Sequence, residues 1–63
     1  MKSVALAQTT DGMWVARDDH GQVIGAFYPE DSGWWYGALA NGTSKRLWAP
    51  AGPAEVARRL FRT

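Results

Sequence analysis

The side chains in this sequence that could act as acids or bases are few, and they stand at predicted turns. His20 is the single imidazole and precedes Gly21 at the tip of a predicted reversal, where we expect a solvated turn residue and not a general base. The carboxylate pairs Asp18-Asp19 and Glu30-Asp31 are adjacent in sequence, so on a strand they would point to opposite faces and would not share a proton. We therefore expect the protein not to be an enzyme and to have no catalytic residue.

Metal and cofactor chemistry is not indicated by the spacing of possible ligands. The chain has no cysteine and one histidine, which excludes a zinc set built from those residues. No acidic stretch has the spacing of a calcium loop, and no glycine-rich loop stands before a helix where a phosphate would bind. The sequence thus predicts no metal site and no cofactor.

Aromatic rings and cations remain, and both suit binding. Four Trp, two Tyr and two Phe in 63 residues are a heavy load for a chain that has no disulfide to stabilise it. The net charge is only +1, which is too small for strong nonspecific attraction to nucleic acid or to anionic membranes. The charge is unevenly distributed, because the acids lie mostly in the first half and most cations in the second: Lys45, Arg46, Arg58, Arg59 and Arg62.

A pattern that occurs twice predicts the elements that carry these side chains. In each copy a glycine opens a strand that holds a tryptophan, a second glycine makes the turn, an aromatic residue returns opposite the tryptophan, and a proline ends the pair. Two β-hairpins, 12–29 and 33–50, are therefore expected. The copies are 21 positions apart: Gly12, Trp14, Gly21, Phe27 and Pro29 recur as Gly33, Trp35, Gly42, Trp48 and Pro50.

The pattern around these hairpins predicts one α+β domain over residues 1–63, an antiparallel meander of four to five strands with one C-terminal helix packed on one face. The helix is expected over 53–62, because proline suits its first position and four apolar residues follow at helical spacing. The expected strands are 13–18, 22–28, 34–40 and 43–49, with a fifth at 3–8 if that segment pairs, and a loop at 29–33 joins the hairpins. The apolar stripe of the helix is Val56, Ala57, Leu60 and Phe61.

Turn chemistry predicts the register of the second hairpin. Asn41-Gly42 is typical of a two-residue type I′ turn, because both residues accept positive φ angles. Counting back from such a turn fixes the cross-strand partners. It places Trp35 opposite Trp48, Gly37 opposite Arg46, and Tyr36 opposite Leu47.

The first hairpin has two possible registers. An equal count about His20-Gly21 places Trp14 opposite Phe27 and Ala16 opposite Gly25. A three-residue loop at 19–21 with a glycine bulge is the alternative, and it would send Phe27 to the face opposite Trp14. The helix is expected on the face where glycines 25 and 37 lower the surface.

The other face of the predicted sheet is too apolar to lie open to solvent. One helix cannot cover both sides, so this surplus is expected to be buried by a partner, by a second copy, or by the N-terminal segment. With equal registers it carries Met13, Val15, Ile24, Ala26, Tyr28, Trp34, Tyr36, Ala38, Lys45 and Leu47.

The second hairpin and the helix carry a recognisable order of residues. Asn41-Gly42, the cations Lys45 and Arg46, Trp48, and the helical residues Ala54, Glu55, Ala57 and Leu60 follow one another within residues 33–61. This order resembles the β-turn-β-helix half of three-stranded DNA-binding modules, such as the arm-binding domains of phage integrases and the plant ethylene-response-factor domain. The resemblance implies a sheet that enters the major groove. It implies a DNA-binding accessory or regulatory protein, for which the nucleic-acid-binding residues would be Lys45, Arg46, Arg58, Arg59 and Arg62.

Protein binding fits more of the sequence, because the surplus apolar face is rich in the residue types of interface cores. In size and style the chain resembles small phage inhibitor proteins, anti-CRISPR proteins among them. The first hypothesis is therefore a non-enzymatic protein that binds a host protein or protein complex and inhibits or modulates it; an obligate homodimer is a further alternative. The expected partner-binding residues are Trp34, Tyr36, Met13, Tyr28, Arg17 and Lys45.

The start of the chain bears on localisation. The apolar run 4–7 stops at Gln8, which is too short for the core of a signal peptide or for a membrane span. The expected location is the cytoplasm, which would be the host cytoplasm for a phage-encoded protein, and no membrane partner is expected.

Overall fold

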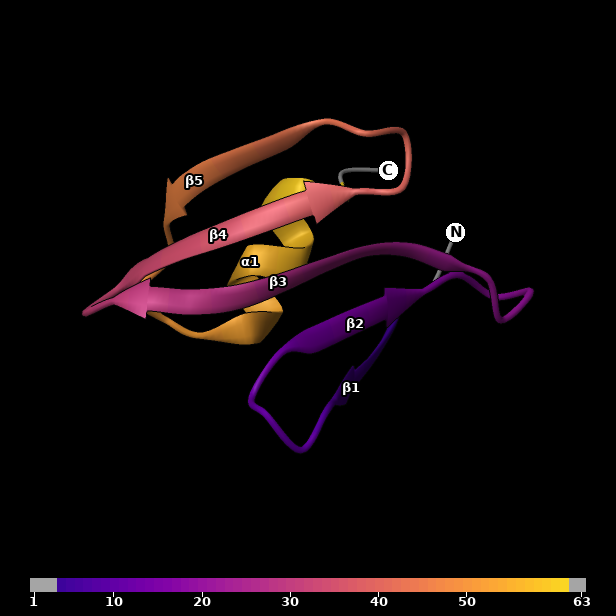
Figure 1. The fold of residues 1–63 in the computed structure, drawn as a ribbon, viewed down its shortest axis with the longest axis horizontal. Coiled ribbons are helices and arrows are strands. Elements are labelled where there is room, and N and C mark those ends of the chain that lie inside the picture. The colour runs from indigo at the N-terminus through magenta and orange to yellow at the C-terminus, as the bar shows by residue number, and fades with distance from the viewer. Residues whose placement is uncertain (1–3, 62–63) are drawn as a thin grey trace.

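An antiparallel sheet with one helix across its back forms the molecule (Figure 1). The computed structural model describes residues 4–61. The strands are neighbours in chain order, so the predicted α+β meander with a C-terminal helix on one face is confirmed, with five strands. The elements are β1 (Ala5–Gln8), β2 (Trp14–Arg17), β3 (Val23–Asp31), β4 (Trp34–Leu39), β5 (Ser44–Trp48) and α1 (Pro53–Leu60).

The junction between the two hairpins differs from the prediction. The expected loop at 29–33 is wrong, because β3 continues to Asp31 through a bulge between Pro29 and Asp31. Proline fits there because Pro29 and Trp35 form a pair that exchanges no hydrogen bonds, so the missing N–H would point toward β2. Since β2 begins at Trp14, opposite Phe27, no strand stands beside Pro29 on that side.

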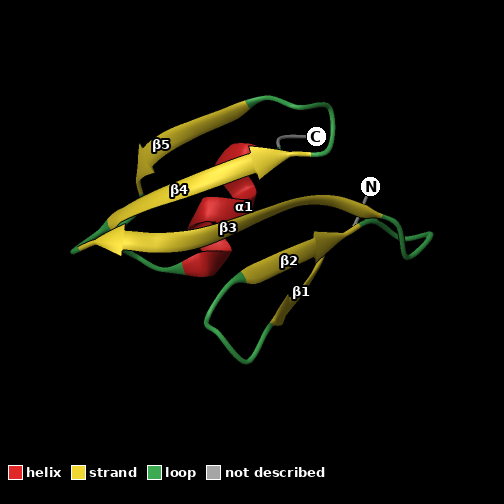
Figure 2. Ribbon diagram, in the orientation of Figure 1, coloured by secondary structure: helices red, strands yellow, loops and turns green. Residues whose placement is uncertain are grey.

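The helix α1 lies behind β3 and β4 in the view of Figure 2. Its apolar stripe is as predicted: Val56, Ala57 and Leu60 are buried, and Phe61 packs against the core. The prediction placed the last residues of the helix at 61–62; α1 ends at Leu60, and residue 62 lies outside the described residues.

Two glycines let the helix come close to the sheet, as the sequence predicted. A Cβ added at Gly25 would lie 2.7 Å from the Phe61 ring, and one added at Gly37 would lie 2.5 Å from Leu60 Cδ1. Both distances are far below van der Waals contact, so neither position has space for a side chain. The larger neighbours close the core around this contact: Phe27 and Trp35 meet edge to face at 5.8 Å between ring centroids.

The first hairpin has the equal register, although its loop has three residues. Asp18 and Gln22 close the loop with an N–H to C=O bond of 2.9 Å, and Gly21 has a φ of 81°. A three-residue loop alone would shift the strands by one position, but an irregularity opposite Ala16-Arg17 shifts them back. Trp14 therefore opposes Phe27, and Ala16 opposes Gly25. The predicted pairs are confirmed, and the predicted change of face for Phe27 does not occur.

The second hairpin has a register that differs by one residue from the prediction. Its loop also has three residues, because the N–H of Leu39 bonds the C=O of Thr43 at 2.7 Å. Gly42 alone in this loop takes a positive φ, 95°, and the Asn41 side chain accepts a bond from the N–H of Thr43 at 2.9 Å. The type I′ turn is therefore wrong. A type I turn followed by a left-handed glycine takes its place.

No compensating bulge occurs in β5, so every side chain of that strand lies on the face opposite to the predicted one. The pairs are Trp34 with Trp48, Trp35 with Leu47, Tyr36 with Arg46, and Gly37 with Lys45. Leu47 packs beside Trp35 against the core, and Trp48 lies on the uncovered face. The three predicted partner pairs of this hairpin are thus corrected.

Candidate functional site

The side of the sheet away from α1, which we call the open face, is covered by no element among residues 4–61. Figure 2 views the molecule from this side, with α1 behind the strands. The side chains here follow from alternation with the core residues Ala16, Phe27 and Trp35. The open face carries Met13, Val15, Ile24, Ala26, Tyr28, Trp34, Tyr36, Ala38, Arg46 and Trp48.

Four rings on β3, β4 and β5 gather on this face, and we call them the aromatic cluster: Tyr28, Tyr36, Trp34 and Trp48. Each ring stands opposite its partner on the neighbouring strand. The two tyrosine rings are 5.5 Å apart and the two indoles 5.4 Å apart, measured between centroids. Trp34 is 40% exposed and Trp48 48%, so the rings contact each other and still present large apolar area to solvent.

Arg46 holds a charged group against the aromatic cluster. Its guanidinium carbon lies 5.2 Å from the centroid of the Trp34 ring, and its Nε lies 2.6 Å from Glu30 Oε1. The cation is thus shared between a ring face and a carboxylate, which fixes its direction along the sheet. Arg46 and Glu30 supply a polar rim of both signs beside the apolar centre.

A shallow depression of about 340 Å³ adjoins the cluster at the start of β2 and is lined by Asp11, Gly12, Met13, Tyr28 and Pro29. The Thr9 hydroxyl donates to the Asp11 carboxylate, and this bond, together with backbone N–H groups, lowers the pKa of Asp11. The depression therefore combines an ionised rim with the apolar side chain of Met13.

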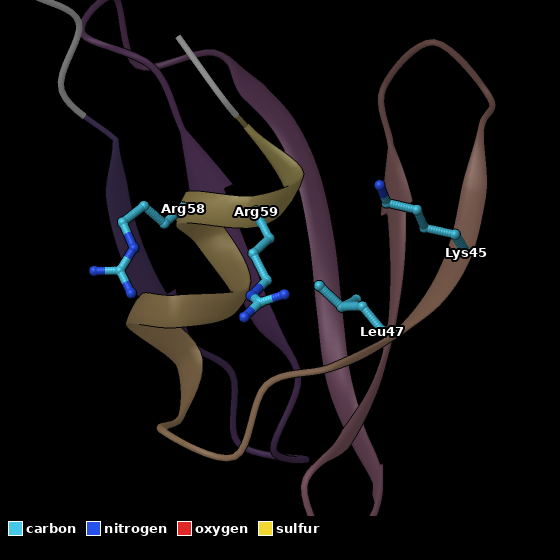
Figure 3. A pocket seen from close by; sticks show the side chains of 4 residues that line it. All are labelled: Lys45, Leu47, Arg58 and Arg59. Atoms are coloured by element: carbon cyan, nitrogen blue, oxygen red, sulfur yellow. The ribbon is translucent and has the colours of Figure 1, made fainter.

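A second hollow lies on the helix side, between α1 and β5, and we call it the basic groove. Its volume is about 510 Å³, and it is lined by Lys45, Leu47, Arg58 and Arg59. Figure 3 shows Lys45 and Leu47 extending from β5 toward the helix, with Arg59 extending from the helix toward β5. Arg59 donates to Glu55 Oε2 from Nη2 at 2.8 Å and from Nε at 3.2 Å.

The structure separates the residues predicted for partner binding into two groups. Met13, Tyr28, Trp34 and Tyr36 lie together on the open face, and Arg17 lies at its far corner, where its guanidinium donates to the Gly21 carbonyl at 3.3 Å. Lys45 lies on the helix side, because the register of β5 is shifted. Trp48 was not predicted for this face, and only the length of the second loop would have revealed it.

The residues predicted for nucleic-acid binding are also divided. Arg46 is on the open face, whereas Lys45, Arg58 and Arg59 line the basic groove. Arg62 lies outside the described residues.

The Asp18 and His20 side chains, considered above as acids or bases, lie at the turn of the first hairpin. Asp18 Oδ1 accepts the backbone N–H groups of His20 and Gln22 at 2.9 and 3.0 Å, as turn aspartates do, and His20 is exposed at the loop tip. Within residues 4–61 no three His, Asp or Glu side chains gather to hold a metal ion. In the same part of the chain no helix is both long and apolar enough to cross a membrane.

No protein-family model matches this chain, and no significant match was found among the curated proteins or the solved structures. The functional argument therefore depends on the two surfaces themselves.

Proposed function

We propose that this chain is a small binding protein that docks a partner protein on its open face, with the aromatic cluster as the centre of the interface. The observation that carries the proposal is the gathering of Tyr28, Tyr36, Trp34 and Trp48 on an uncovered sheet face. In its narrower form the proposal takes the partner to be a host protein complex that the chain inhibits or modulates.

The composition of the open face supports a protein partner. Interface cores are rich in Tyr, Trp, Met and Arg, and the residues that contribute most binding energy are often Trp, Tyr and Arg. All four types occur here in direct contact or beside one another. The rings of the cluster already touch, so little side-chain freedom remains to be lost when a partner binds.

Duplex DNA is the alternative partner, and the division of the cations bears on it. A sheet that enters a groove needs cations on the same face for phosphate contacts. On the open face Arg46 is paired with Glu30, and the remaining predicted cations of β5 and α1 line the basic groove. A protein partner therefore fits this face better than a nucleic acid.

A second copy of the chain is the remaining alternative for the same face. An obligate homodimer would bury the aromatic cluster at a two-fold axis and double the mass in solution. Sedimentation equilibrium at micromolar concentration distinguishes this outcome, since the docking proposal expects a monomer in the absence of its partner.

The double variant Trp34→Ala, Tyr36→Ala tests the proposal. We expect it to fold, because both side chains lie outside the core, and to lose association with the partner that wild type enriches from an extract of the host cell. The matched control is Arg58→Ala, on the helix side, which should retain the partner. An unchanged affinity of the double variant for the purified partner, measured by titration calorimetry, would remove the open face as the site.

A further inference from the structure

The outer edge of β5 has backbone groups that point away from the sheet. The N–H of Leu39 bonds Thr43 and the N–H of Ala49 bonds Gly33, at 2.7 and 2.8 Å, so residues 43 and 49 face β4. Along an antiparallel strand the N–H and C=O groups of successive residues point alternately to one neighbour and to the other. Residues 45 and 47 therefore also direct these groups toward β4. The N–H and C=O groups of Ser44, Arg46 and Trp48 then point outward, and β5 is the last strand of the sheet.

The basic groove lies on the helix side of the sheet, between β5 and α1. Lys45 and Leu47 extend from β5 into the space between the strand and α1, and Arg59 faces them from the helix (Figure 3). A strand added at the free edge of β5 would place alternate side chains on this same side of the sheet, next to Lys45 and Leu47 and facing the groove. Extended peptides are bound in this way at exposed sheet edges, where main-chain hydrogen bonds give affinity and the surroundings of alternate side chains give specificity.

The charge of the groove selects the kind of strand. Within residues 4–61 neither Lys45 nor Arg58 takes part in an ion pair, whereas Arg59 is paired with Glu55. A carboxylate entering the groove would meet Lys45 directly and would have Arg59 opposite. Leu47 gives the floor an apolar point between the two cations.

We propose that the basic groove and the free edge of β5 bind an extended acidic segment of a partner protein, which adds as a sixth strand with its carboxylates facing Lys45 and Arg59. A second copy of β5 paired antiparallel about this point is disfavoured, because Lys45 or Arg46 would then oppose the same cation of the copy. A phosphate backbone offers negative charge but no ladder of N–H and C=O groups to pair with the edge. This site shares β5 with the open face, but it uses the backbone edge and the helix-side residues of that strand and none of the ring contacts.

The experiment uses the whole chain and a fluorescein-labelled peptide of alternating Glu and Val, with a Lys-Val peptide as its charge control. Fluorescence anisotropy should show binding of the Glu-Val peptide and none of the Lys-Val peptide. We expect Lys45→Glu to weaken binding about tenfold or more, since it replaces attraction by repulsion. Arg17→Glu makes the same change of charge at a corner far from the groove and should leave the affinity within about twofold.

Backbone pairing has its own readout. N-methylation of every second residue of the peptide removes the N–H groups on one side of the strand only. We expect one set of methylated positions to abolish binding and the alternate set to preserve it, whereas binding by charge alone would be indifferent to the choice. Circular dichroism of Lys45→Glu verifies that the fold is retained, and Trp34→Ala, Tyr36→Ala should bind the peptide as wild type does.

Three results would overturn the proposal. The first is a Glu-Val peptide that binds no tighter than about 1 mM. The second is equal binding of the two N-methylated sets. The third is a short DNA duplex that binds more tightly than the peptide and is weakened by Lys45→Glu, which would make the groove a phosphate site. None of these results concerns the open face, so the two proposals fail separately.

Discussion

Glu55 ties the loop before α1 to the last turn of the helix. Gly52, which precedes the helix, provides no side-chain cap, and Glu55 Oε1 accepts the free N–H of Ala51 at 3.0 Å. Its other oxygen accepts two bonds from Arg59. These contacts favour the ionised carboxylate, so the backbone bond from Ala51 first and then the bond from Arg59 lower the pKa of Glu55 below its ordinary value of 4.5.

The lowered pKa predicts how stability changes with acid. Because the folded state prefers the ionised form, the contribution of Glu55 is complete above pH 4.5 and is lost as the pH falls through the folded-state pKa. We expect Glu55→Gln to be less stable than wild type at neutral pH. The difference should shrink below pH 4.5 and vanish once the wild-type carboxyl is protonated. Urea unfolding followed by circular dichroism across this range measures it.

The matched control for this prediction is Asp19→Asn, which removes a carboxylate from the exposed tip of the first hairpin. Its unfolding free energy at neutral pH should stay close to that of wild type, because the pair of Asp19 with His20, 3.7 Å apart, is exposed to solvent. A pH profile of Glu55→Gln parallel to that of wild type would contradict the assignment of Glu55 as the ionised carboxylate that ties this loop to the helix.

Both hairpins have loops of three residues. They differ in the second strand of each hairpin, which is β3 in the first and β5 in the second. In the first hairpin an irregularity in β3 restores the register, whereas β5 runs on without one. This single difference decides that Trp48 lies on the open face and Leu47 beside the core. The content of both candidate sites therefore depends on the register of β4 with β5.

An engineered disulfide tests that register. Ala38 and Ser44 oppose each other and exchange no hydrogen bonds, a pair whose Cα atoms are about 4.5 Å apart and within disulfide range. We expect Ala38→Cys, Ser44→Cys to oxidise completely in air and to raise the unfolding midpoint in urea. The control Ala38→Cys, Lys45→Cys puts the two thiols on opposite faces and should stay reduced, as measured by thiol titration. Preferential oxidation of the control would indicate the register of a two-residue turn.

The hairpins and the helix could be predicted from the sequence, because glycine, tryptophan and proline recur at a fixed spacing. At each position the residue type suits a turn, a strand or the end of a hairpin. The face of β2 and β3 could also be predicted, since Ala16 and Gly25 are small where the helix comes close. The face of β5 could not. Leu47 and Trp48 are both apolar, so alternation fits either register, and Asn41-Gly42 is compatible with loops of two or three residues. Trp34, Tyr36 and Tyr28 lie on the predicted face of the sheet, and Lys45 does not.

A domain of this size has little stability to lose. At about 0.05–0.15 kcal/mol per residue, 63 residues give about 3–9 kcal/mol. One helix of eight residues covers one face of the sheet, so the core is a single layer between α1 and the strands. The open face contributes ring contacts to the fold and leaves Tyr28, Trp34 and Trp48 37–48% exposed. The molecule thus keeps its core aromatics and the aromatics of the proposed interface on opposite sides of one sheet.

Trp34 and Trp35 make this division measurable, because they are adjacent, identical in chemistry and on opposite faces. Trp35 is 8% exposed, and its indole N–H donates to the Ala49 carbonyl at 3.1 Å. Trp35→Ala should cost about 3–5 kcal/mol and leave the chain largely unfolded at 25 °C, since that is a large share of the total. Trp34→Ala removes the ring contacts with Trp48 and Arg46 outside the core, and we expect it to cost about 1 kcal/mol and to leave the fold intact. Thermal unfolding by circular dichroism compares the two variants; similar losses in both would mean that the open face belongs to the core, and the docking proposal would then lose its surface.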